Sequence, residues 1–127
     1  MDRHTASRLK KEKVIWLVTA SKDAHPQAVP VWFAWDGKSF LIYAQDGIKV
    51  RHISENPYVE LHLNSDEVGD EVVRVSGRAT LIKKPPAAQH ALYLRKYRPD
   101  IRDVGMTPAD FFRQYGNVIR VARPRFH

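Results

Sequence analysis

The segment from Asp46 to His52 holds the side chains best suited to chemistry. It reads Asp-Gly-Ile-Lys-Val-Arg-His and follows a strand-like run, so we expect it to open a short helix. Lys49 and Arg51 would then lie beside the free backbone N–H groups of a helix start. Such a start attracts anions because its dipole end is positive and its amides donate hydrogen bonds. The segment therefore predicts a phosphate site, and the alternative is a solvated basic turn.

The run from Gln27 to Trp32 is a second candidate, with the sequence Gln-Ala-Val-Pro-Val-Trp. Pro30 cannot donate a hydrogen bond to a neighbouring strand, which places this strand at a sheet edge or at a bulge. Unpaired backbone groups at such an edge could bind the polar rim of a planar heterocycle. Gln27 would add an amide that both donates and accepts. An ordinary edge strand would show the same pattern.

Side-chain groupings that catalyse a reaction unaided are missing. None of the six histidines has metal-binding spacing, and the chain has no cysteine, no Gly-x-Ser-x-Gly elbow and no glycine-rich phosphate loop. His62, between two leucines, is expected to face solvent or to form a hydrogen bond. We therefore predict no catalytic side chain and no metal site. An enzyme with this sequence would need a bound cofactor to carry the reaction.

Composition narrows the class of protein. The 127 residues predict a single domain spanning 1–127, and 21 Lys and Arg against 14 Asp and Glu give a net charge of +7. Six acids lie within residues 52–73, which contain no Lys or Arg, so the remainder is strongly basic and an anionic partner is expected. No apolar run approaches the roughly 20 residues that span a bilayer. With no signal-like apolar stretch near Met1, we expect a cytoplasmic protein without a membrane partner.

The periodicity predicts a mainly β chain with short helices at its corners. Asp36-Gly37 is a strong hairpin turn, and Gly77 is expected at a bend or bulge within a long strand. Strands joined by hairpins close into a small antiparallel barrel, which removes exposed edges. The expected strands are 14–20, 27–35, 39–45, 58–63, 71–82 and 116–122, and the expected helices are 2–13, 48–55, 87–97 and 108–114.

The order of these segments resembles a known family. The quoted motifs are Asp-x-x-His-Pro-Gln, Val-Pro-Val-Trp-Phe, Trp-Asp-Gly, Gly-Ile-Lys-Val-Arg-His-Ile, Asn-Pro-Tyr-Val and Val-Arg-Val-Ser-Gly-Arg-Ala. The chain resembles the pyridoxamine-5′-phosphate-oxidase-like split-barrel flavoproteins, and more narrowly the small branch that uses the deazaflavin coenzyme F420. The resemblance covers residues 5–84 well and the C-terminal third loosely.

This resemblance implies a six-stranded antiparallel split β-barrel of the FMN-binding type that forms a homodimer with cofactor sites at its interface. By analogy, Lys49 and Arg51 would hold the cofactor phosphate, with the Val50 backbone beside them. The strand at 27–35 would line the ring and its ribityl chain, and the strand at 39–45 would approach the phosphate side. The residues implied on these two strands are Gln27, Val29, Pro30, Val31, Trp32, Tyr43, Ala44 and Gln45.

The resemblance implies an oxidoreductase that transfers a hydride between reduced deazaflavin and a small organic substrate. FMN is the alternative cofactor, although flavin-using relatives often place an arginine or Ser/Thr where this chain has Gln45 and Gly47. The substrate-phosphate residues of a true pyridoxamine phosphate oxidase are not found. A non-catalytic flavin or haem-type binding module is a further alternative. So is a basic barrel that binds nucleic acid, but the acidic stretch argues against a nucleic-acid partner.

Overall fold

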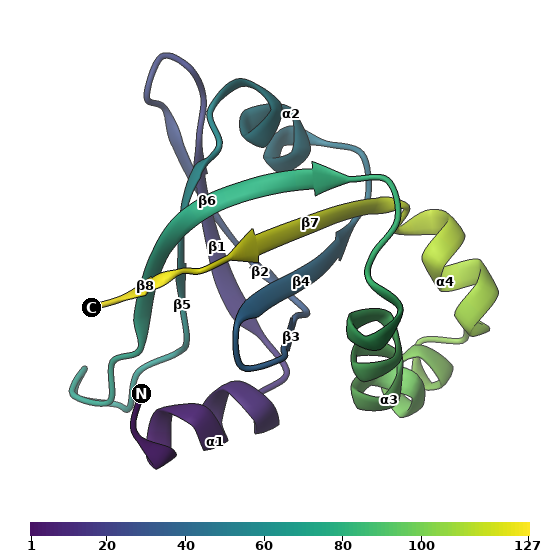
Figure 1. The fold of residues 1–127 in the computed structure, drawn as a ribbon, viewed down its shortest axis with the longest axis horizontal. Helices are drawn as coiled ribbons and strands as arrows, with labels where there is room; N and C mark the ends of the chain where they lie inside the picture. Colours follow the sequence, from purple (N-terminus) through teal and green to yellow (C-terminus); the bar gives the residue numbers. More distant parts are fainter.

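The computed structural model describes residues 1–127 as one curled antiparallel sheet with helices around it (Figure 1). Two of its eight strands are only two residues long, which leaves the six longer strands that the pattern predicts. The strands are β1 (Ile15–Ala20), β2 (Pro26–Val31), β3 (Ala34–Trp35), β4 (Ser39–Ala44), β5 (Tyr58–His62), β6 (Arg74–Ile82), β7 (Asn117–Ala122) and β8 (Arg125–Phe126). The helices are α1 (Arg3–Lys11), α2 (Ile48–Glu55), α3 (Ala87–Asp103) and α4 (Pro108–Gln114).

The sheet runs in the order β2-β1-β5-β6-β7-β4-β3, and β8 pairs with β6. The long, curved strand β6 joins its two halves, because β6 pairs with β5 through Tyr58–His62 and with β7 through Ala79–Ile82 (Figure 1). Gly77 lies where β6 changes partner. A Cβ atom at this position would lie 2.7 Å from Cγ1 of Val121 on β7, so the curvature requires glycine there.

Strand β2 lies at the edge of the sheet, as Pro30 predicts, because its only partner is β1. The predicted strand at 27–35 is wrong in its length, however, since it breaks after Val31. The Phe33 N–H donates to the Tyr97 hydroxyl at 2.9 Å, and the Lys96 ammonium donates to the Phe33 carbonyl at 2.9 Å. The side chains of Tyr97 and Lys96 on α3 thus bind the Phe33 backbone groups that, in a continuous strand, would form hydrogen bonds with a neighbouring strand.

Helix α3 continues to Asp103, beyond the predicted end at Tyr97, with Pro99 inside it. A proline there removes one backbone hydrogen bond. Tyr97 and Ile101, on either side of it, are fully buried, so side-chain packing holds the helix together across the proline. The first residues of the helices lie close to the predicted ones. The Asp2 side chain accepts a hydrogen bond from the Thr5 N–H, and the Thr107 side chain accepts one from the Asp110 N–H, as N-caps do.

Every residue of β4 is buried, because its two faces belong to two different apolar clusters. Phe40, Ile42 and Ala44 point into the barrel, whereas Leu41 and Tyr43 pack under α3 and α4. Strand β4 therefore connects the barrel interior to the helical layer, and its C-terminal end leads directly into α2. None of the four helices combines the length and the apolar character that a membrane crossing requires.

Candidate cofactor site

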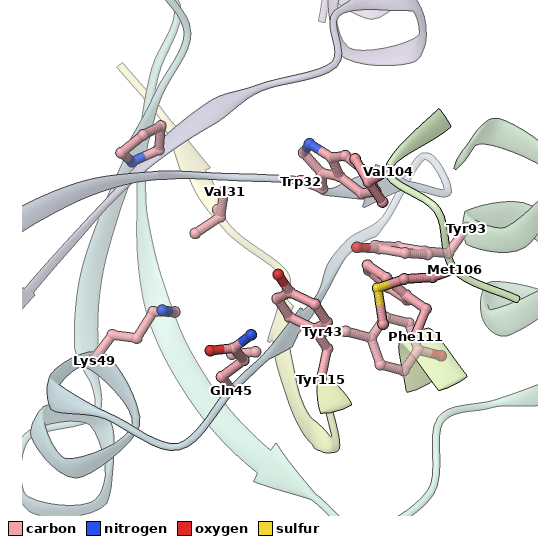
Figure 2. Close-up of a pocket in the computed structure, with 12 residues that line it drawn as sticks. Val31, Trp32, Tyr43, Gln45, Lys49, Tyr93, Val104, Met106, Phe111 and Tyr115 are labelled. Atoms are coloured by element: carbon pink, nitrogen blue, oxygen red, sulfur yellow. The ribbon is translucent and has the colours of Figure 1, made fainter. Parts of the chain in front are cut away.

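A cavity of about 440 Å³ opens where the ends of β2 and β4 meet the start of α2 and the helices α3 and α4 (Figure 2). Lys49 is the one charged side chain in its wall. The opposite wall is aromatic and apolar. The lining residues are Pro30, Val31, Trp32, Tyr43, Ala44, Gln45, Lys49, Tyr93, Val104, Met106, Phe111 and Tyr115.

The open edge of β2 forms one side of this cavity. Pro30 pairs with Trp16 across β1 and β2. Because proline has no N–H, this pair cannot exchange the two backbone hydrogen bonds of a bonded pair, so the backbone polar groups of Ala28 and Pro30 face away from β1. No further strand covers this edge. The edge therefore offers backbone donors and acceptors to a ligand beside Val31.

The start of α2 forms the cationic end of the cavity. Gly47 is the N-cap, and no side chain caps the helix, in contrast to Asp2 of α1 and Thr107 of α4. The first intrahelical bond runs from the Arg51 N–H to the Gly47 carbonyl, which leaves the earlier amides free to bind an anion. The Asp46 carboxylate accepts a hydrogen bond from the Asn117 amide at 2.8 Å instead.

The structure brings together most, but not all, of the residues that the sequence predicts for the cofactor. The predicted residues that line the cavity are Pro30, Val31, Trp32, Tyr43, Ala44, Gln45 and Lys49. Arg51 is exposed and lies outside the lining, because residues two apart on a helix point to different sides. Val50 packs against the barrel core, and Gln27 and Val29 are half-buried farther along β2.

The aromatic wall comes from the C-terminal third, where no site residue was predicted. Tyr93 on α3, Phe111 on α4 and Met106 just before α4 line the same end of the cavity as Trp32 (Figure 2). Trp32 stacks on Tyr97 with ring centroids 4.7 Å apart, and it also stacks on Phe111 at 5.6 Å. The signal was present as aromatic residues at helical spacing (93 and 97, 111 and 115), but their partner in β2 could not be known from the sequence.

Few polar groups lie in or behind the aromatic wall, and burial shifts the pKa of two of them. The Tyr43 hydroxyl forms a hydrogen bond with Nδ1 of His90, and burial raises the pKa of Tyr43. Burial also lowers the pKa of Lys96, behind this wall, to about 8. No group of His, Asp or Glu side chains has an arrangement that could hold a metal ion. The cavity therefore suits a planar molecule with an anionic end at Lys49.

Comparison with known proteins agrees with this geometry. A family model described as pyridoxamine 5′-phosphate oxidase matches residues 1–114. The chain belongs to the pyridoxamine 5′-phosphate oxidase family. This confirms the family that the sequence motifs indicate, and the match extends through α4 to include the aromatic wall. The comparison with curated proteins finds no match.

Solved structures of the same split-barrel fold cover almost all of the chain, so the predicted fold is confirmed. An F420 reductase is 26% identical, with a TM-score of 0.66 over 95% of this chain and 94% of that one. A pyridoxamine 5′-phosphate oxidase-type protein from Listeria innocua is 17% identical, with a TM-score of 0.72 over 98% and 94%. The heme storage protein HutZ from Vibrio cholerae is 11% identical, with a TM-score of 0.68 over 97% and 89%.

Proposed function

We propose that this protein binds the deazaflavin coenzyme F420 and is an oxidoreductase that transfers a hydride between the reduced coenzyme and a small organic substrate. One observation carries the proposal: Lys49 and the uncapped start of α2 lie on the same cavity as the open edge of β2. An anion site next to a strand edge suits a cofactor with a phosphate and a planar polar ring. The 26% identity to an F420 reductase supports the choice of deazaflavin.

The residues present fit such a cofactor. Lys49 and the free amides at the start of α2 would hold the phosphate, with Gln45 beside them and Arg51 on the outer rim. The backbone carbonyl of Pro30 would bind the polar rim of the ring, since it faces away from β1 and no further strand covers this edge, and the Val31 side chain would lie against the ring. When bound, the deazaflavin supplies the hydride chemistry. The chain's own part is to orient the ring and, with Trp32 and Phe111, to exclude water.

The proposal includes a homodimer whose partner chain completes the site. Ile48, beside Lys49, leaves 47% of its surface exposed, and Tyr58 leaves 66% exposed, although both are large apolar residues. A second chain that covers Ile48 would also close the cationic end of the cavity. We expect light scattering at micromolar concentration to give twice the chain mass of 14.7 kDa. A monomer under these conditions would contradict a site shared between two chains.

The identity of the cofactor can be tested by titration of the purified protein with oxidised F420 and, in parallel, with FMN. The fluorescence of each ring reports its binding. We expect saturable binding of F420 and weaker binding of FMN. Hemin is a third arm, followed by its absorbance, because a heme storage protein shares the fold. Single-stranded nucleic acid is a fourth. Binding of nucleic acid with steep salt dependence, and of none of the three cofactors, would overturn the proposal.

A further inference from the structure

The hydroxyl of Tyr93 has no hydrogen-bond partner, although the side chain is completely buried. An unpaired buried hydroxyl costs about 1–3 kcal/mol of folding free energy, so buried polar groups without partners are uncommon in native proteins. Tyr93 lines the cavity, and Figure 2 shows its hydroxyl directed toward the space that the lining side chains enclose. The hydroxyl is therefore a donor placed at the cavity without an acceptor from the protein.

The two tyrosines packed against Tyr93 differ from it, because the hydroxyl of each has a hydrogen-bond partner within the protein. The Tyr97 ring lies 4.8 Å from the Tyr93 ring, and its hydroxyl accepts from the Phe33 N–H at 2.9 Å and donates to the Lys13 carbonyl at 2.7 Å. The Tyr43 ring lies 4.6 Å from the Tyr93 ring, and its hydroxyl is bonded to His90. Of these three hydroxyls, only that of Tyr93 remains available to a ligand.

The surroundings of Tyr93 indicate what kind of ligand could use it. Apart from Lys49, none of the side chains that line the cavity with Tyr93 carries a charge, and nine of the twelve lining residues are hydrophobic. Desolvation of a charged ligand here would go uncompensated, whereas a flat apolar ligand would gain stacking and dispersion contacts. Burial raises the pKa of Tyr93 well above its usual value, so the hydroxyl keeps its proton and stays a donor.

We propose that the Tyr93 hydroxyl binds the carbonyl oxygen of an uncharged, planar, conjugated carbonyl compound that occupies the aromatic end of the cavity. This inference rests on the proposed function, because it names the organic substrate's class and places that substrate beside the cofactor site. The hydroxyl is closed to solvent in this structure, so a neighbouring side chain moves to admit the ligand. Met106 is suited to this movement because it is unbranched and packs against the cluster that contains Tyr93.

The test compares two flat, uncharged bicyclic probes, chromone with a carbonyl and naphthalene without one, by calorimetry on wild-type protein and on Tyr93→Phe. We expect wild-type protein to prefer chromone, and Tyr93→Phe to weaken chromone binding about threefold to tenfold, the usual effect of one neutral hydrogen bond. Naphthalene binding should not change. The free Tyr93→Phe protein should melt at the same temperature as wild type or higher, because the substitution removes an unpaired group.

Tyr97→Phe is the matched control, since it removes a hydroxyl that is fully bonded within the protein. We expect it to lower the melting temperature and to leave the preference for chromone over naphthalene intact. Equal chromone affinity in wild type and Tyr93→Phe, or no binding of chromone to wild type, would overturn the inference. Oxidised F420 should bind Tyr93→Phe as it binds wild type. If F420 binds neither protein while chromone discrimination persists, the proposed function fails and the Tyr93 site stands.

Discussion

Replacement of Lys49 by alanine should weaken the binding of oxidised F420 by roughly tenfold to a hundredfold, the range expected for one hydrogen bond to a charged group. Lys49 is the one charged side chain that lines the cavity, and it lies in the first turn of a helix whose start has no side-chain cap. Loss of its ammonium removes the one cation in the cavity wall and leaves the phosphate to the backbone amides, Gln45 and the more distant Arg51. Titration of the variant by ring fluorescence measures the effect.

Two further variants make this result specific. Lys22→Ala removes the same charge from the exposed turn between β1 and β2, and we expect it to leave F420 binding unchanged. Lys49→Arg keeps the charge and should retain part of the affinity. The ion pairs of the structure do not involve Lys49, so the alanine variant should melt like wild type. Equal losses in Lys22→Ala and Lys49→Ala would show a general effect of net charge and would contradict a phosphate site at α2.

Gly77→Ala should lower the free energy of unfolding by about 1–3 kcal/mol, the usual cost of overpacking a core. The added methyl group would lie 2.7 Å from Cγ1 of Val121, which is closer than two carbon atoms approach. Val121 is fully buried and β-branched, so its side chain has little freedom to move away. Urea unfolding monitored by tryptophan fluorescence gives the change in midpoint.

The steric origin of this effect can be tested with a double-mutant cycle. Val121→Ala alone should be destabilising because it leaves a cavity, but combined with Gly77→Ala it removes the clash and the new methyl group fills part of the space. We therefore expect the double variant to be more stable than the sum of the two single effects. Gly47→Ala is the control, since its methyl group meets no atom within 4 Å. Simple additivity in the cycle would exclude a clash between these positions.

Much of the fold could be predicted because local rules and tertiary packing agree. The β-rich runs became strands, Pro30 placed β2 at the edge, and Thr107 capped α4 as its position indicates. The predicted element boundaries were wrong where contacts with residues distant in the sequence outweighed the local conformational preference of the chain. Pro99 should end a helix, yet buried Tyr97 and Ile101 continue α3 across it. The strand at 27–35 was interrupted because α3 side chains bind the Phe33 backbone.

The sequence by itself determined the strand edge at Pro30 and the helix start that carries Lys49, because each depends on residue type and short spacing alone. Only the tertiary structure decided which neighbours share the cavity. Lys49 lines it and Arg51 does not, since two helical steps turn a side chain to another face. The aromatic wall and the free hydroxyl of Tyr93 come from α3 and α4, which reach β2 through packing between residues more than 60 positions apart.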